Sequence, residues 1–313
     1  MKKTTTILAV LAASAVLASS ASAAISVGAD QTFGTSNYRG TKANASIDIG
    51  DSLYITPTFT TYRTDNSSGS YYQGGLRVGY ELGPLSLGVM GAIVPKNDGY
   101  KQNSFGADLT FSLAPGHTKH GHRMAGPASQ NNETYGYGLA GVDLGGSVIH
   151  TTHSDDYTAN GTSGDALRQQ GVQRANRFTV GETDLTAFAG LKFLITEISA
   201  SVSKSVYDKS LDNNLVRESP FMPMGEFVAI ESGFPESSYN GKIKWTMLPF
   251  VKPYVSFTHT NFKLGSAPSN ATEAGLNVGL DMLNVKGAYG HYSQSGFSAR
   301  NYFSIGASLN FGE

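Results

Sequence analysis

Histidines gather in one stretch of this sequence, where their imidazoles could bind a metal ion. Five of the seven His residues fall between residues 117 and 153. These are His117, His120, His122, His150 and His153. Imidazole nitrogens at such spacing are ligands for Zn, Cu or Ni. Lys119 and Arg123 lie in the same stretch and would repel a cation. The sequence leaves two interpretations open: a metal site, or a polar, solvated segment that is rich in His.

A second group with possible chemistry lies near the C-terminus. The stretch His291-Tyr292-Ser293-Gln294 resembles the His-x-Ser signature of the outer-membrane lipid A deacylases. In that family a His activates a Ser nucleophile on the outer face of a barrel, so the resemblance implies lipid hydrolysis by Ser293. Gln294 stands where the family has Asn, and residues 301–311 supply no carboxylate to orient His291. The alternative is the end of a strand in an aromatic belt at the membrane surface.

Residues 208–238 combine charged and apolar side chains. Phe221-Met222-Pro223-Met224 is too apolar for a freely solvated loop. If this stretch folds into the mouth of a barrel, its charged residues would line a constriction. Those residues are Arg217, Glu218, Glu226 and Glu231. The alternative is a loop with a small apolar cluster of its own.

The elements that must position these residues show the two-residue period of β-strands. Apolar and polar side chains alternate over segments of roughly ten residues, as expected for strands of a membrane barrel. In residues 239–247, for example, Ile243 and Trp245 alternate with Lys242 and Lys244. Pro57 and Pro253 sit inside predicted strands, where the missing N–H indicates a bulge or an early boundary.

The alternation assigns several charged residues to the polar face, which would line the lumen of a barrel. They are Lys42, Asp48, Arg77, Glu81, Asp108, Lys192, Lys242, Lys244, Lys252 and Lys286. The basic residues outnumber the acidic ones in this set. An open lumen with this lining would favour anions.

The N-terminus predicts export from the cytoplasm. Lys2 and Lys3 precede an apolar run, and Ala21-Ser22-Ala23 suits signal peptidase, so residues 1–23 read as a signal peptide. The apolar run is too short for a spanning helix. The rest of the chain, residues 24–313, reads as one barrel domain. The formal net charge of −1 argues against a nucleic-acid partner.

The connections between predicted strands are of two kinds. Leu82-Gly83-Pro84 and Leu144-Gly145-Gly146 are short and carry turn residues. Residues 154–181 and 208–238 are long and are predicted as extracellular loops. Fifteen strands are counted, including 134–143 and 147–153, whereas bacterial single-chain barrels use even numbers. The predicted strands before and after residues 114–133 would run in the same direction, which a chain with a simple connection between antiparallel strands does not allow. The His-rich stretch 114–133 is therefore either a polar strand or an insertion into the lumen.

The last predicted strand resembles the C-terminal strand of outer-membrane barrel proteins. Phe303, Ile305, Leu309 and Phe311 alternate down to a nearly terminal aromatic residue, followed by Gly312 and Glu313. The resemblance implies recognition by the barrel-assembly machinery and a location among outer-membrane lipids. The fold class expected is all-β: a transmembrane, antiparallel, up-and-down barrel of about 14–16 strands with short periplasmic turns and long extracellular loops.

A barrel of this size predicts a porin-like channel for passive diffusion of small polar solutes, without catalysis or a cofactor. A homo-oligomer is one possible assembly. The alternatives are a non-channel surface barrel, acting as an adhesin or structural protein through its long loops, and a barrel enzyme that uses His291 and Ser293.

Overall fold

The computed structural model describes most of the chain beyond the N-terminal segment. The described residues are 24–50, 52–63, 70–97, 100–113, 123–130, 139–155, 178–209, 218–224, 227–232, 234–248, 250–263, 267–280 and 282–311. The predicted signal peptide, 1–23, lies outside them. No helix among the described residues has the length and apolar character needed to cross a membrane.

Strands make up nearly all of the described structure. Their bounds are β1 (Ile25–Gly34), β2 (Tyr38–Ile49), β3 (Leu53–Arg63), β4 (Tyr71–Leu82), β5 (Leu85–Asn97), β6 (Tyr100–Leu113), β7 (Ala140–Asp155), β8 (Phe178–Phe193), β9 (Thr196–Tyr207), β10 (Glu218–Met224), β11 (Phe227–Ser232), β12 (Pro235–Trp245), β13 (Val251–Phe262), β14 (Ser269–Leu280), β15 (Leu283–Gln294) and β16 (Arg300–Phe311). One short 3₁₀ helix, η2 (Pro127–Gln130), lies between β6 and β7.

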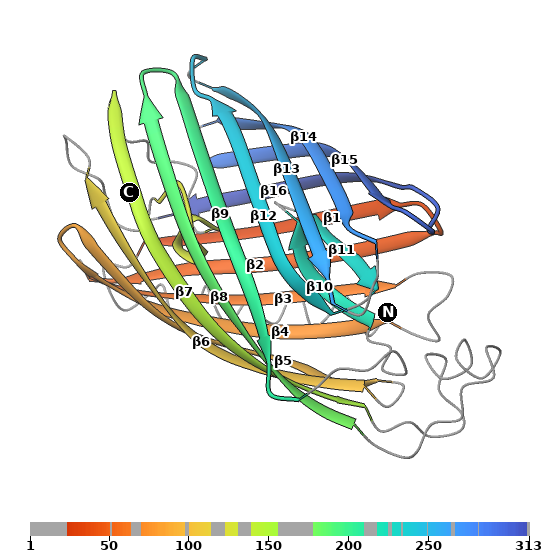
Figure 1. Ribbon diagram of the computed structural model, residues 1–313. Helices are drawn as coiled ribbons and strands as arrows, with labels where there is room; N and C mark the ends of the chain where they lie inside the picture. Colours follow the sequence, from red (N-terminus) through yellow and green to blue (C-terminus); the bar gives the residue numbers. More distant parts are fainter. Residues whose placement is uncertain are drawn as a thin grey trace, which may run out of the picture.

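Fourteen of these strands close into one antiparallel barrel in which sequence neighbours pair with each other (Figure 1). The first and last strands close it, with Ile25 opposite Phe311 and Phe33 opposite Phe303. Closure pairs every barrel strand on both sides, which removes the exposed edges that an open sheet would leave. Strands β10 and β11 pair only with each other and form a separate hairpin between β9 and β12. The predicted all-β, up-and-down barrel is confirmed.

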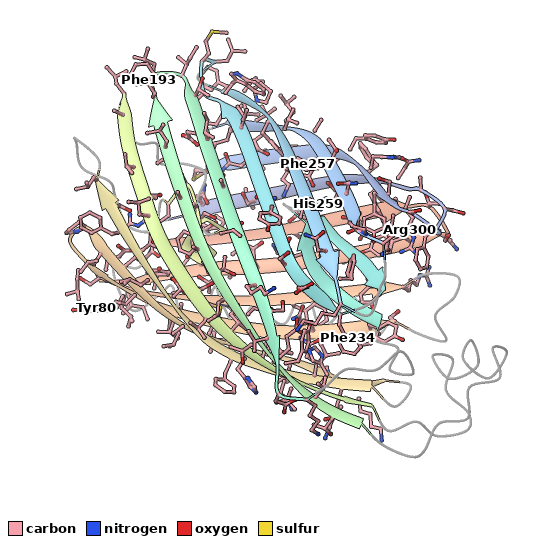
Figure 2. All side chains as sticks on the ribbon, viewed as in Figure 1. Tyr80, Phe193, Phe234, Phe257, His259 and Arg300 are labelled. Carbon is pink, nitrogen blue, oxygen red and sulfur yellow. The ribbon has the colours of Figure 1, made fainter. Side chains whose placement is uncertain are left out.

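The two faces of the barrel wall differ in chemistry because side chains alternate along each strand. The outer face carries exposed large apolar residues on every side, among them Leu76 on β4, Val148 on β7 and Leu276 on β14. Figure 2 shows this outward layer, with Tyr80 and Phe193 labelled near the same end of the barrel. Such a band is what the hydrocarbon of a bilayer covers in membrane barrels. Polar and charged residues face inward.

The predicted turn at Leu144-Gly145-Gly146 is wrong. These residues lie in the middle of β7, which runs unbroken from Ala140 to Asp155 and pairs with β6 and β8 along its length. Two predicted strands, 134–143 and 147–153, are therefore one strand. The merger gives an even number of barrel strands and restores the alternation of strand direction. Residues 114–139 connect β6 to β7, and those of them that the structure describes, 123–130 and 139, are not a strand of the barrel wall.

The two ends of the barrel carry different connections. The start of β1 and the end of β16 lie at the end that we call the terminal end, where short connections also join β2 to β3, β4 to β5, β8 to β9, β12 to β13 and β14 to β15. The strand ends that residues 156–177 and 208–234 join lie at the opposite end, which we call the loop end. The connection 114–139 is the exception, because it is long and lies at the terminal end. At the tight turn between β4 and β5, Gly83 takes a positive φ of 58°.

The two prolines interrupt hydrogen bonding without shifting the register. Pro57 lies in β3, and the β2–β3 register is the same on both sides of it: Asn44 opposes Thr58, and Ile47 opposes Ile55. Pro253 lies in β13 and pairs with Leu276 of β14, while the β12–β13 pairing ends one residue away at Tyr254. The predicted bulges are absent from these described strands.

Candidate functional site: the barrel lumen

All ten charged residues predicted to line the lumen lie on inward-facing positions of their strands. They are Lys42, Asp48, Arg77, Glu81, Asp108, Lys192, Lys242, Lys244, Lys252 and Lys286. They divide into two groups. We call the inner face of β3–β8 the strap-side wall and the inner face of β12–β16, β1 and β2 the lysine-side wall.

An arginine and an aspartate form the centre of the strap-side wall. Arg77 of β4 donates from Nε to Asp108 Oδ2 (2.9 Å) and from Nη2 to Asp108 Oδ1 (2.7 Å). Its Nη1 donates to the hydroxyl of Tyr54 (2.6 Å), which lies 3.1 Å from Ser86 Oγ. Arg77 and Asp108 are both buried. This two-pronged pair ties β4 to β6 across β5, and charge-assisted bonds of this geometry are among the stronger polar contacts.

A segment from the connection between β6 and β7 covers part of the same wall. We call Arg123–Gln130 the lumenal strap. Arg123 pairs with Glu81 of β4, and the backbone N of Met124 donates to Asp143 Oδ2 of β7 (2.6 Å). The other carboxylate oxygen, Asp143 Oδ1, accepts from Ser112 Oγ (2.6 Å). Both partners face inward, so the strap lies inside the barrel. Of the two alternatives for the His-rich stretch, the polar strand does not hold for residues 123–130, whereas the insertion into the lumen does.

The wall beneath the strap lacks side chains where the strap comes closest. A Cβ at Gly190 would lie 2.7 Å from Met124 Cβ, closer than such atoms pack. A Cβ at Gly145 would collide with the ring of Phe188, which also packs against Gly126 of the strap. A side chain at Gly145 would therefore displace Phe188, and one at Gly190 would press the strap slightly away from the wall.

The lysine-side wall carries a row of charged residues at one level. Register pairs run from Lys252 to Asn277, Lys286, Gly306, Asp30 and Lys42 across five neighbouring strand pairs. Lys286 Nζ lies 3.8 Å from Asp30 Oδ1, and both side chains are 24% exposed. The row holds three positive charges against one negative charge. Its lysines are half-buried rather than buried, so they remain accessible from the lumen.

A second part of the lysine-side wall surrounds Tyr254. Lys242 Nζ lies 4.3 Å from the centre of the Tyr254 ring, and the Tyr254 hydroxyl donates to Glu273 Oε1 (2.6 Å). Next to it, Glu197 of β9 lies between two lysines, 2.6 Å from Lys244 and 3.4 Å from Lys192. Glu197 therefore joins the lysine-side wall to β8.

Six inward-facing acidic residues were missed by sequence reasoning. They are Asp30, Asp143, Glu182, Asp184, Glu197 and Glu273. For Glu182 and Asp184 the signal was available in the alternation itself, since both lie an even number of residues from Lys192 on β8. With these six included, basic residues no longer outnumber acidic ones among the inward-facing charges of the whole lumen. Basic residues remain in excess on the lysine-side wall.

Tyrosines pack together inside the barrel toward the loop end. Tyr62 stacks on Tyr71 with ring centroids 5.0 Å apart, and Tyr38 meets Tyr302 edge to face at 5.2 Å. Tyr254 and Tyr292 belong to the same buried cluster. The tyrosines come from β2, β3, β4, β13, β15 and β16, so the cluster fills part of the lumen next to the lysine-side wall.

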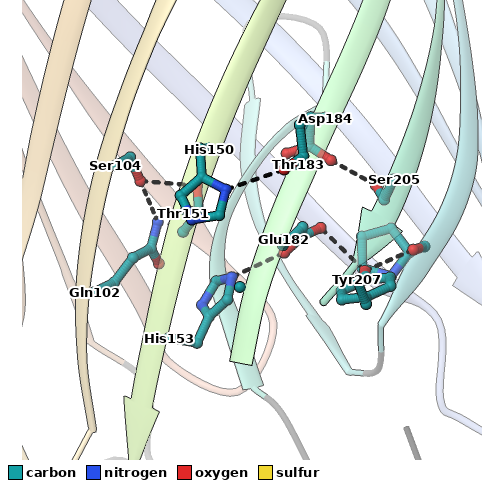
Figure 3. Close-up of polar contacts among 12 residues, drawn as sticks. Gln102, Ser104, His150, Thr151, His153, Glu182, Thr183, Asp184, Ser205 and Tyr207 are labelled. Atoms are coloured by element: carbon teal, nitrogen blue, oxygen red, sulfur yellow. Dashed lines mark hydrogen bonds and ion pairs between the residues drawn. The ribbon is translucent and has the colours of Figure 1, made fainter. Parts of the chain in front are cut away.

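The two described histidines of the His-rich region lie on opposite faces of β7. His153 faces inward and is buried, with Nε2 2.8 Å from Glu182 Oε2 (Figure 3). His150 faces outward, where it packs against Phe105 and lies 3.0 Å from Thr183 Oγ1. A strand cannot aim both imidazoles at one ion. His117, His120 and His122 lie outside the described residues, and the described part of the chain holds no group of three metal-ligating side chains.

His153 belongs to a buried group that holds the end of the 208–234 connection. Tyr207 Oη lies 3.0 Å from Glu182 Oε1 and 2.7 Å from the carbonyl oxygen of Pro235. Phe234 is fully buried and meets the Tyr207 ring edge to face at 5.6 Å. The single hydroxyl proton of Tyr207 can be donated to only one of these two oxygens at a time. The chain is thereby fixed to β7, β8 and β9 where it enters β12.

His291 and Ser293 both lie on the outer face of β15 near the loop end. His291 Nδ1 is 2.8 Å from Asn301 Oδ1, which also accepts from the Tyr289 hydroxyl (2.9 Å). Among the described residues, no carboxylate contacts His291, and Ser293 makes no hydrogen bond to it. The geometry shows a hydrogen-bonded belt of polar and aromatic residues at this rim.

The candidates for a constriction loop are only partly described. Arg217 and Glu226 lie outside the described residues. Glu218 begins β10 and opposes Ser232, and Glu231 of β11 opposes Ser219, so their backbones belong to one hairpin. A constriction by these four residues stays a prediction.

No known protein-family model matches this sequence, and no curated protein matches it either. Among solved structures, CdiB from Acinetobacter baumannii is similar with a TM-score of 0.50 and 10% sequence identity, over 93% of this chain and 60% of that one. This chain therefore spans about three fifths of CdiB. A loop-deletion mutant of OmpT, an outer membrane protein of Vibrio cholerae, gives a TM-score of 0.43 at 11% identity, over 92% and 98% of the two chains. The KdgM porin in complex with disordered oligogalacturonate gives 0.41 at 6%, over 91% and 99%. The likeness is one of fold: the chain folds as an outer-membrane type of β-barrel, and no specific family is found.

Proposed function

We propose that this protein is a porin-like channel in the cell outer membrane, through which small polar solutes diffuse passively. Solutes would be selected by the width of the lumen and by the charges along it, with no catalytic step. The observation that carries the proposal is the lysine-side wall, whose cationic row faces the interior of a closed barrel.

The number of strands supports an internal path. Barrels of eight strands are filled by their own side chains, whereas barrels of 16–18 strands leave an aqueous channel. Fourteen strands lie between these limits. In this barrel the strap-side wall and the tyrosine cluster fill part of the interior, and the half-buried lysines mark where polar surface remains accessible.

The charge distribution supports anions as the favoured solutes. The strap-side wall binds its charges internally, as in the pairs Arg77–Asp108 and Arg123–Glu81. The row of Lys42, Lys252, Lys286 and Asp30 keeps a surplus of two positive charges. A surplus on a confined wall raises the local concentration of counter-ions, and this effect weakens as salt screens it.

The experiment that tests this proposal is conductance of the purified protein in planar bilayers under a KCl gradient. We expect stepwise conductance and a reversal potential on the anion-selective side. Replacing Lys42, Lys252 and Lys286 together by Gln changes the row from two net positive charges to one net negative charge. The reversal potential should then move toward cation selectivity while conductance steps persist.

The matched control is Lys204→Gln. Lys204 is exposed and pairs with Glu236 at 2.9 Å on the outer surface, so its loss should leave selectivity unchanged. Folded protein that gives no conductance would contradict the channel. Conductance with the same reversal potential in the parent and the triple variant would contradict the role of the lysine-side wall.

A further inference from the structure

The lumenal strap, Arg123–Gln130, suggests a function that the barrel wall does not explain. A short turn suffices to connect two antiparallel strands, and the five other connections at the terminal end are short. The connection between β6 and β7 instead places residues 123–130 against the inner wall. Its backbone and side chains contact β4, β7 and β8.

Buried polar contacts hold the strap. Arg123 is 4% exposed and pairs with Glu81, which is 8% exposed. Asp143 is 0% exposed and binds the strap through the backbone N of Met124. Leaving a buried carboxylate or guanidinium without its partner is costly, so these contacts favour the docked position strongly. Ala125 is also buried.

The wall is shaped to receive the strap. Glu81, Ser86, Thr110, Gly145 and Phe188 follow one another as register pairs from β4 to β8. Arg123 contacts the first residue of this row, and Gly126 packs against the last. Four strand spacings separate them, about 19 Å at roughly 4.8 Å each. Between them Ser86 and Thr110 are 0% exposed, although both face a lumen.

We propose that the lumenal strap is a built-in constriction that narrows the terminal end of the channel, and that Glu81 and Asp143 act as its two anchors. The inference rests on the proposed channel function. In this proposal the narrowest part of the channel lies at the terminal end, beside the strap-side wall. The lysine-side wall then supplies charge selection, while the strap sets the size of the solutes that pass.

The first part of the test detects docking without measuring conductance. The chain has no Cys of its own, so two cysteines introduced at positions 124 and 190 have no other thiol in the chain to pair with. A disulfide needs Cβ atoms about 3.5–4.5 Å apart, and the 2.7 Å separation here requires only a small outward shift. We expect Met124→Cys with Gly190→Cys to oxidise to a disulfide in the membrane. The control pair, Met247→Cys with Gly190→Cys, should stay reduced because Met247 lies exposed on the outer face.

The second part measures conductance after the anchors are weakened. Glu81→Gln with Asp143→Asn removes both anchoring charges while keeping side-chain volume. We expect unitary conductance to rise on the order of twofold as the strap leaves the wall. Adding the Met124 and Gly190 cysteines and oxidising them should return conductance to the parent value. Glu236→Gln, at an exposed carboxylate on the outer surface, is the matched control and should leave conductance unchanged.

The outcomes separate the two proposals. Absence of the disulfide in folded protein overturns docking of the strap. Disulfide formation with equal conductance in the parent, the anchor variant and the oxidised variant overturns the constriction. If the disulfide forms and no variant conducts at all, the channel function fails and the docked strap plugs a closed barrel, which also overturns the constriction as proposed. If the anchor variant does not fold, replacing residues 124–130 by a Gly-Ser linker gives the same comparison with Glu81 and Arg123 intact.

Discussion

The two inner walls of the barrel contain the same four parts, a tyrosine, a glycine, a cation and a carboxylate, and use them differently. On the strap-side wall, Tyr54 packs over Gly79, with Arg77 over its ring at 5.0 Å. On the lysine-side wall, Tyr254 packs over Gly275, with Lys242 over its ring at 4.3 Å. Each tyrosine fills space that a Cβ on the facing glycine would occupy. A cation and a carboxylate accompany each tyrosine.

The difference lies in the cation. The planar guanidinium of Arg77 binds both oxygens of Asp108 and the Tyr54 hydroxyl at once, so Asp108 neutralises its positive charge within the wall. Lys242 is a point charge at the end of a flexible chain, on the same wall as Lys252 and Lys286. If the barrel is the proposed channel, one wall contributes rigidity and supports the strap, and the other presents charge to solutes. Mutations on the first wall should change stability, and those on the second should change selectivity.

The largest expected effect comes from Arg77→Met. It leaves the Asp108 carboxylate buried without its main partner, which should cost about 3–5 kcal/mol of unfolding free energy. The measurement is urea unfolding in lipid vesicles, followed by the fluorescence of Trp245, the one Trp of the chain. Lys242→Met on the other wall should cost no more than about 1 kcal/mol.

A double variant separates the lost pair from lost packing at Arg77. Arg77→Met with Asp108→Leu removes both charges and should recover much of the stability, since no buried ion then lacks a partner. If the double variant is as unstable as Arg77→Met alone, the ion pair is not the reason that the strap-side wall is rigid.

A smaller loss is expected from His153→Phe, at the loop end of the strap-side wall. The substitution leaves Glu182 buried without the imidazole at 2.8 Å and should cost about 1–3 kcal/mol. The same unfolding measurement applies. His150→Phe on the outer face of the same strand is the control and should have little effect, because His150 already packs against Phe105. Equal losses at the two positions would mean that the buried pair adds nothing.

The glycines test whether the tyrosines are fixed in both walls. In Gly79→Ala the new Cβ meets the ring of Tyr54, and in Gly275→Ala it meets the ring of Tyr254. Each overpacking should cost about 1–3 kcal/mol. Gly241→Ala places its Cβ where nothing lies within 4 Å, so that variant should unfold like the parent. A neutral Gly79→Ala would show that Tyr54 can move aside and that its wall is not rigid.

Much of the fold could be predicted from the sequence because alternation is a local property. The ten predicted lumen residues all face inward for this reason. Leu144-Gly145-Gly146 misled the prediction because adjacent glycines suit a turn as well as a strand. In the structure Gly145 keeps space for Phe188, a residue distant in the sequence, so local pattern could not reveal its role.

The pairings within the lumen could not be predicted in the same way. Which acid meets which base depends on register between strands that lie far apart in the chain, as for Arg123 and Glu81. His150 and His153 show that nearness in sequence can also mislead. Their spacing suggested a shared site, but the alternation of side chains along β7 places them on opposite faces of the strand. Asn301 lies beside His291 only because β15 and β16 pair at that level.

The smallest effect is expected from a single substitution on the lysine-side wall. Lys286→Gln removes one member of a partly exposed pair whose atoms are 3.8 Å apart. Such a pair contributes about 0–1 kcal/mol, so Trp245-monitored unfolding should barely change. The reversal potential should still move toward cation selectivity, by less than in the triple variant, because the row then keeps one net positive charge instead of two. A large loss of stability in Lys286→Gln would place this lysine with Arg77 as a structural residue, and the distinction between a supporting wall and a selecting wall would fail.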